Sequence, residues 1–343
     1  MLFGEHCGAR LALPRDLQIA YTVGRMGLAT AADAGPLFYG SHNTARSGFA
    51  RLVTLGVLRT FPRTNPASPL WYALSPEAAE WVAAESGAAP GELRVVSGIR
   101  RLNLAALGAR NRLWVSVVLA ARASATVEVV RVAPEWELRR ARSPGVGIVP
   151  DALFVLAARG QSSDVEPCAS MVELDSGAER LAVWVAKAAA YRDLRSRGPL
   201  YGASRWHILA VVPTSRRGRT VAEAVVAGGA AMFTWIGVAG ALERGHAFEP
   251  VLARADALAS LGEAAARASL ADLVAPGSAT VISDPDQPLI GLQQGELGAG
   301  RALAGGVDGV IRPARGRERV DPVAGELGAI VVDGDGIEID VDA

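Results

Sequence analysis

The sequence predicts a mixed α/β protein preceded by a smaller, mostly helical unit. Three observations support this fold class. Apolar residues recur at helical spacing in several segments, short apolar runs have the character of strands, and the two kinds of segment alternate through the middle of the chain. A length of 343 residues suggests two domains with an appendage. The domains we expect are 1–90, 91–275 and 276–343.

Composition limits the class of protein. The formal net charge of +0 excludes a uniformly basic coat for nucleic acid, while a local basic face remains compatible with it. Two distant cysteines, Cys7 and Cys168, argue against a disulfide framework and against a cysteine-based zinc site. The first residues lack the pattern of a signal peptide, and the apolar run 113–121 is too short to span a bilayer. We therefore expect a soluble, cytoplasmic protein with no membrane partner.

The first eighty residues predict three helices and a hairpin. A helix with a proline start is expected over 14–24, and a short second helix follows a turn at Gly27. The third helix is capped by Ser41 or Asn43 and carries an apolar stripe. Two strands separated by a Pro/Asn/Ser turn come next, and Ser75 opens a further helix.

This order of helices and hairpin resembles the winged helix-turn-helix layout, and LVTLGVLRTF…PLWYALS resembles the recognition helix and wing of bacterial winged-helix proteins. In that layout a helix enters the major groove of DNA and the wing touches phosphates. Residues 1–75 contain seven arginines against three acids, an excess with the sign that phosphate contact needs. We predict double-stranded DNA as the partner, with a protein partner as the alternative. The candidate DNA-binding residues are Arg46, Arg51, Arg59 and Arg63.

The middle of the chain predicts the α/β unit. A long helix is expected over about 97–123, followed by the strand-like runs TVEVVRVA, PEWELRRA, GIVPDALFVLAA and ASMVELD. A helix over about 178–195 and the apolar strand WHILAVVPT complete a mixed sheet. We interpret 216–220, RRGRT, as a solvated basic loop. From about residue 276 the composition predicts irregular strands or a partly ordered acidic tail that competes with DNA for the basic face.

Acids and one amine mark a candidate site in this unit. Glu173 and Asp175 end one strand-like run, and because side chains two apart on a strand share a face, they should point the same way. Asp151, from a neighbouring strand, would complete an oxygen-rich cluster suited to Mg²⁺ or Mn²⁺. Lys187 is the only lysine of the chain and lies on the apolar face of the next helix. It needs an anionic partner, and the acid cluster is the nearest candidate.

The series Pro150-Asp151, VELD, and Lys187 with Tyr191 resembles the PD-(D/E)XK nuclease superfamily. Joined to a winged helix, it is similar to the replication-relaxation family of bacterial mobile elements and plasmids, over about residues 14–215. The resemblance implies a mixed α/β, restriction-endonuclease-like core. It implies that the catalytic residues are Asp151, Glu173 and Lys187, and that the metal ligands are Asp151, Glu173 and Asp175. Supporting roles fall to Tyr191 and to Glu137, for which Glu135 competes.

In such a nuclease the metal polarises a phosphodiester and activates a water, while the ammonium stabilises charge on the phosphate. Two departures weaken the match, since Asp175 stands where a lysine is expected and the helix of 100–123 contains no acid. The alternatives are a catalytically inactive DNA-binding or assembly factor, which could act with other replication or mobilisation proteins, and a winged-helix protein-interaction module.

Each candidate also has a purely structural interpretation. Asp175 suits a helix cap, Asp151 a turn, and Lys187 a helix edge where it pairs with any acid. Tyr191 has the character of a core residue, and so does His207, which lies in an apolar strand. The single lysine does not follow a glycine loop, which excludes a P-loop and leaves no nucleotide cofactor expected.

Overall fold

The computed structural model confirms the mixed α/β class. It describes residues 14–63, 65–89, 91–98, 103–141, 147–160, 166–243, 246–262 and 265–274. All of them belong to one compact unit that spans residues 1–301, and the predicted tail 276–343 lies outside them. A domain boundary near residue 90 stays a prediction.

The N-terminal part forms the predicted helices and hairpin. A three-stranded antiparallel sheet in the order β1-β3-β2 packs with them. Ser41 caps the helix His42–Thr54, because its Oγ accepts from the backbone N–H of Thr44 at 3.2 Å. The elements are α2 (Pro14–Met26), β1 (Ala29–Thr30), α3 (Ala31–Ala34), η1 (Gly35–Leu37), α4 (His42–Thr54), β2 (Leu58–Phe61), β3 (Trp71–Leu74) and α5 (Pro76–Ser86).

The core of this part follows the helical spacing of its apolar residues. Helix α2 buries Ile19 and Val23, and α4 buries Phe49 and Leu52 one turn apart. The rings of Phe49 and of Tyr72 on β3 pack edge to face, with 5.0 Å between the ring centroids. This packing leaves the opposite side of α4 exposed, from residue 41 to 44 and again at 46 and 47.

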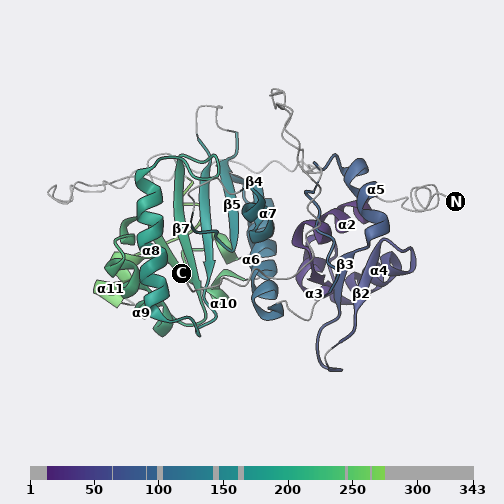
Figure 1. The fold of residues 1–343 in the computed structure, drawn as a ribbon, viewed down its shortest axis with the longest axis horizontal. Helices are drawn as coiled ribbons and strands as arrows, with labels where there is room; N and C mark the ends of the chain where they lie inside the picture. The colour runs from purple at the N-terminus through teal and green to yellow at the C-terminus, as the bar shows by residue number, and fades with distance from the viewer. Residues whose placement is uncertain are drawn as a thin grey trace, which may run out of the picture. The chain divides into compact units, whose positions relative to one another are not determined.

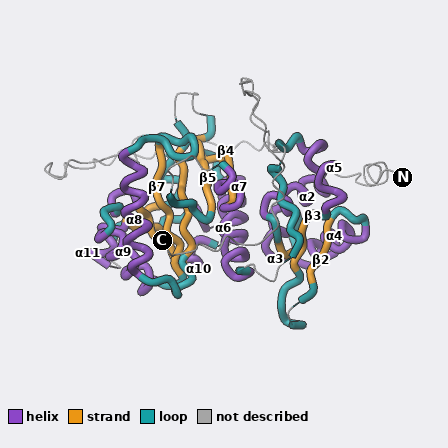
Figure 2. Tube along the Cα trace, viewed as in Figure 1, coloured by secondary structure: helices purple, strands orange, loops and turns teal. Residues whose placement is uncertain are grey.

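The second part is built on a seven-stranded mixed sheet in the order β10-β9-β8-β7-β6-β5-β4 (Figures 1 and 2). Strands β6, β7 and β8 run parallel, and their outer neighbours pair antiparallel. The strands are β4 (Val127–Pro134), β5 (Ala152–Ala158), β6 (Cys168–Leu174), β7 (Arg205–Val212), β8 (Thr234–Val238), β9 (Leu252–Arg254) and β10 (Arg267–Ala268).

Helices cover both faces of this sheet. Helix α6 (Leu104–Ala123) packs on one face, and α8 (Leu181–Ser196) and α9 (Ser215–Ala227) pack on the other (Figure 1). The alternation along β6 sends Cys168, Ser170 and Val172 toward the first face and Ala169 and Met171 toward the second. Glu173 has the parity of Met171, so it arrives on the α8 face. Shorter helices complete the unit: α7 (Glu135–Arg140), η2 (Ala231–Phe233), α10 (Ala239–Leu242), η3 (His246–Phe248) and α11 (Ala255–Leu261).

Two predictions of secondary structure are wrong. The segment PEWELRRA is not a strand: β4 ends at Pro134 and helix α7 follows. Glutamates in its first turn and arginines in its last complement the helix dipole, which outweighs the strand-like appearance of the segment. The supposed basic loop 216–220 is the first part of α9, because Thr214 caps this helix by accepting from Arg217 N at 3.2 Å.

Helix α6 has the length and apolarity of a membrane span, with 20 residues and a mean hydropathy of 1.2, but 56% of that window is buried within the protein. Its contacts with the sheet account for its composition. Leu113 and Val117 on α6 belong to the same buried cluster as Phe154 on β5 and Val172 on β6.

Candidate functional site

The ends of β5 and β6 bring two of the predicted acids together. The strands are in register with Ala152 opposite Val172, which sets Asp151 opposite Glu173. The N–H of Asp151 donates to the carbonyl of Val172 at 2.9 Å, and the N–H of Leu174 donates to Asp151 Oδ2 at 2.7 Å. The Asp151 carboxylate is therefore held in place by the backbone of the neighbouring strand.

Helix α8 supplies both partners of the second acid. Glu173 is 2% exposed. Its Oε2 lies 2.9 Å from Lys187 Nζ, and its Oε1 accepts from the hydroxyl of Tyr191 at 2.6 Å. Residues four apart on a helix lie on one face, so Lys187 and Tyr191 reach the same carboxylate. The structure thus assembles Asp151, Glu173, Lys187 and Tyr191, while their chemical roles remain predictions.

Lys187 has a second acid partner that sequence reasoning missed. Its Nζ lies 3.0 Å from Glu179 Oε1 and 5.3 Å from the centroid of the Trp184 ring. Glu179 precedes the first residue of α8 and has no periodic relation to the helix face. The only available signal was an acid just before the helix, where the helix dipole favours negative charge.

Burial dominates the electrostatics of this cluster. It raises the pKa of Glu173 to about 7, against the lowering effects of Lys187 and of the hydrogen bond from Tyr191, and Asp151 adds to the rise. Burial also raises the pKa of Asp151, while the backbone N–H of Leu174 and the charge of Lys187 oppose it. Glu173 and Glu179 raise the pKa of Lys187 despite its burial, so the ammonium stays charged.

The raised pKa of Glu173 predicts a pH dependence of stability. The folded state holds this proton more tightly than the unfolded chain, so this group should lower the free energy of unfolding as the pH rises from about 4.5 to about 7. We expect urea unfolding of Glu173→Gln to lack this decline. His207, whose pKa burial lowers to about 3, acts in the opposite direction below pH 6.5, and it is present in both proteins. Equal pH profiles for the two proteins between pH 5 and 8 would contradict the prediction.

Asp175 does not join the cluster. Its Oδ1 accepts from the N–H of Gly177 at 2.7 Å, which closes a turn just after β6. Its Oδ2 pairs with Arg217 Nε at 2.5 Å, and Arg217 also donates to the carbonyl of Glu179. The basic first turn of α9 therefore binds an acid of its own chain. Arg217 was not among the predicted residues, because only the fold brings α9 beside the end of β6.

The expected convergence of three carboxylates is corrected. In the part of the chain that the structure describes, no group of three or more His, Cys, Asp or Glu side chains could hold a metal ion. Asp175 is paired with Arg217, and both oxygens of Glu173 are bonded to Lys187 and Tyr191. Asp151 alone keeps an oxygen, Oδ1, without a hydrogen-bond partner among the described residues. As arranged, the donor set does not fit Mg²⁺ or Mn²⁺, which take several oxygen ligands.

A family model described as replication-relaxation matches residues 24–203, more than half of the chain. The protein belongs to the replication-relaxation family. Membership suggests a role in the replication or relaxation of a plasmid or mobile element. The matched range contains Asp151, Glu173 and Lys187 but stops before Arg217. No curated protein and no solved structure matches the chain.

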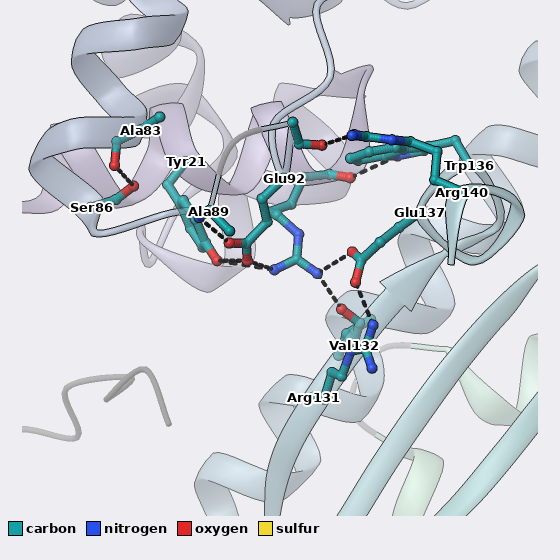
Figure 3. Close-up of polar contacts among 12 residues, drawn as sticks. Tyr21, Ala83, Ser86, Ala89, Glu92, Arg131, Val132, Trp136, Glu137 and Arg140 are labelled. Atoms are coloured by element: carbon teal, nitrogen blue, oxygen red, sulfur yellow. Dashed lines mark hydrogen bonds and ion pairs between the residues drawn. The ribbon is translucent and has the colours of Figure 1, made fainter. Parts of the chain in front are cut away.

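In this replication-relaxation protein, Glu137 belongs to a different cluster from the one predicted. Its Oε2 lies 2.6 Å from Arg25 Nη2 and its Oε1 lies 2.7 Å from Arg131 Nη2. Arg25, on α2, also donates to Glu92, to the hydroxyl of Tyr21 and to the carbonyl of Val132 on β4. Figure 3 shows Tyr21 and Glu92 facing Glu137 and Val132. We call the contacts of Arg25 with these four residues the Arg25 node. It joins the N-terminal helices to the edge of the large sheet.

The predicted DNA-binding arginines have different surroundings. Arg46 on α4 and Arg63 in the β2–β3 loop are exposed, and Arg63 donates to the carbonyl of Pro66. Arg51 is committed to an ion pair with the buried Asp16. Arg59 packs over the ring of Phe61, with its Cζ 5.2 Å from the centroid. Arg46 and Arg63 are therefore the two of the four that remain most accessible to a phosphate.

His207 is a core residue, as predicted. It is buried on β7, its Nε2 lies 2.8 Å from Ser170 Oγ, and its Nδ1 lies 3.5 Å from Cys168 Sγ. These partners are neighbours on β6 that face α6. The hydrogen bond to Ser170 satisfies a ring that is shielded from solvent.

Proposed function

We propose that this protein is a DNA-binding factor for plasmid or mobile-element replication or relaxation, with a nuclease-like core that binds DNA without cutting it. One observation carries the second half of the proposal. Glu173, the acid that a nuclease would offer to a metal, already has one oxygen on the Lys187 ammonium and the other on the Tyr191 hydroxyl. In this proposal the Lys187 ammonium takes the place of a divalent ion at Glu173.

The arrangement of the N-terminal elements supports a winged helix. Helices α2, α3 and α4 precede a β2–β3 hairpin, and β1 pairs with the same hairpin. Helix α4 would act as the recognition helix, because its capped N-terminus and Arg46 are exposed. The β2–β3 loop would act as the wing and bring Arg63 to the phosphates.

The order of elements in the second part supports a nuclease-like core. Helix α6, three antiparallel strands β4 to β6, helix α8 and the parallel strand β7 follow one another. Asp151 and Glu173 end adjacent strands, and Lys187 faces them from α8. This set favours a second candidate function, metal-dependent nicking of DNA. That function would require Mg²⁺ or Mn²⁺ to displace Lys187 from Glu173 and to break the bond from Tyr191.

Two measurements on the same preparation separate these candidates. The proposed factor should bind a fluorescein-labelled duplex in EDTA, with an affinity that falls as salt rises. It should leave supercoiled plasmid intact with Mg²⁺ and with Mn²⁺. Nicking that disappears in both Asp151→Ala and Glu173→Ala would establish the nuclease instead. An absence of salt-dependent binding would point to a protein-interaction module.

Arg46→Ala tests the proposed DNA-binding surface. The side chain of Arg46 is exposed and forms no ion pair within the described ranges, so its loss should leave folding intact. We expect weaker binding to every duplex, with the slope of log affinity against log salt reduced by about 1. Fluorescence anisotropy at several salt concentrations measures both quantities.

The matched control is Arg267→Ala. Arg267 is also an exposed arginine, on β10, at the opposite edge of the large sheet from β4. The Arg267→Ala variant should bind DNA with the affinity and salt slope of the wild type. If both variants lose affinity to the same extent, DNA binding depends on the net charge of the protein and not on the proposed recognition helix.

A further inference from the structure

A cavity of about 150 Å³ opens beside Asp151. It lies where the α2–β1 turn, the segment that follows α5, helix α6 and the ends of β5 and β6 meet. Its charged lining comes from Arg94, Arg110, Glu135 and Asp151, Asn103 adds an amide, and its apolar lining includes Leu28 and Leu107. The family assignment and the proposed function leave this cavity without a role.

The arginines of the cavity have unused hydrogen-bond donors. Arg110 is 6% exposed, and its NH2 donates to the carbonyl of Met26 at 2.8 Å. Its Nε has no hydrogen-bond partner among the described residues. A buried donor without a partner is costly, and such groups in native proteins often face a water or a ligand. Burial lowers the pKa of Arg110 to about 10, which leaves it charged at neutral pH.

Arg94 is held against the cavity by the backbone. Gly27 has a φ of +79°, and a Cβ at this position would lie 3.0 Å from Arg94 Cδ. Glycine is therefore required both by the turn and by the close approach of the arginine stem. The Arg94 guanidinium forms no hydrogen bond within the described part of the chain. Burial lowers its pKa.

The chemistry of the lining selects the ligand class. Two guanidinium groups face two carboxylates, so a free anion such as phosphate would meet repulsion from Glu135 and Asp151. A neutral group with both donors and acceptors fits such a lining better. A cavity of this volume holds one aromatic ring, and the apolar walls suit its faces.

We propose that this cavity receives one unpaired nucleobase of the bound DNA. The proposal rests on the proposed function, because the base arrives on DNA held by the protein. Cytosine matches the lining, since its amino group can donate to a carboxylate and its ring carbonyl can accept from Arg94 or Arg110. The base would bind next to Asp151, which places an unpaired nucleotide at the acidic site.

The test compares three fluorescein-labelled duplexes: one fully paired, one with a single unpaired cytosine, and one with an abasic tetrahydrofuran at the same bulge. The wild type should bind the cytosine bulge about tenfold more tightly than the abasic bulge, in line with base stacking in other single-strand sites. Equal affinities for the two bulges would overturn the inference. If the fully paired duplex also fails to bind, the proposed function fails as well, so the two failures are distinguishable.

Variants locate the effect in the cavity. Ala106 lines it, and Ala106→Phe should fill it and abolish the tenfold preference. Ala105→Phe is the matched control, because Ala105 is the exposed neighbour on α6 and should leave the preference unchanged. Arg94→Gln removes guanidinium donors that form no hydrogen bond with the described residues, and it should reduce the preference even if Ala106→Phe folds poorly. A preference kept by both Ala106→Phe and Arg94→Gln would place base recognition elsewhere.

Discussion

Lys187→Met should lower the free energy of unfolding at pH 8 by about 3–5 kcal/mol, the range found when one partner of a buried ion pair is removed. Methionine keeps most of the volume of the side chain but leaves Glu173 without a counterion. Glu173 is 2% exposed, so water cannot replace the ammonium. Urea unfolding followed by tryptophan fluorescence measures the loss.

The double variant Lys187→Met/Glu173→Gln supplies the decisive comparison. It removes both charges, and it should regain most of the stability that the single change loses. At pH 6 the single change should cost less than at pH 8, because Glu173 has a pKa of about 7 and can become neutral. Arg192→Ala, an exposed position on the same helix with a 54% exposed side chain, should change stability by less than about 0.5 kcal/mol. A cost for Lys187→Met no larger than that of Arg192→Ala would refute the role of the pair.

Arg25→Ala should be the other costly substitution, at about 3–5 kcal/mol, because it leaves Glu92 without its cation and Glu137 with Arg131 alone. Arg25 is 9% exposed and binds Glu92, Glu137 and the carbonyl of Val132 together. Through the carbonyl of Val132 it connects α2 to β4 at the edge of the large sheet. We expect denaturant unfolding of the variant to separate into two transitions, as the N-terminal part loses its coupling to the sheet.

Two companion changes interpret that result. Arg25→Lys keeps the charge but loses the planar fork that reaches Glu92 and Glu137 at once, so it should lie between wild type and Arg25→Ala. Gln18→Ala, at an exposed position on the same helix, should unfold as the wild type does. A single transition in Arg25→Ala, with wild-type stability, would show that the node does not couple the two parts.

Local patterns in the sequence were sufficient for most of the elements. The apolar spacing of Ile19, Val23, Phe49 and Leu52 predicted α2 and α4 because a helix must bury one stripe. The capping roles of Ser41 and Ser75 were readable because a cap depends on residues three positions away. The segment 134–141 was wrongly predicted to be a strand, because the charges that favour a helix there are weaker signals than an apolar run.

The candidate site divides in the same way. The pairing of a lone lysine with Glu173 was expected from the sequence, because an amine on an apolar helix face needs an anion, and the structure has this contact. The separation of Asp175 from the cluster was not expected, because it depends on Arg217, which is 42 residues away in the chain. The same holds for Glu137, whose partner Arg25 is 112 residues away.

The sequence by itself determined the mixed α/β class, the helices and hairpin of the N-terminal part, and the set of residues from which a site could be made. Only the tertiary structure decided which acids pair with arginines that are distant in the chain. Periodicity and capping act over a few residues, whereas an ion pair needs its two groups within about 4 Å regardless of their distance along the chain. Lys187 pairs with Glu173 and Arg217 pairs with Asp175, so two of the three expected metal ligands lie in internal ion pairs. The third, Asp151, lies beside an open cavity.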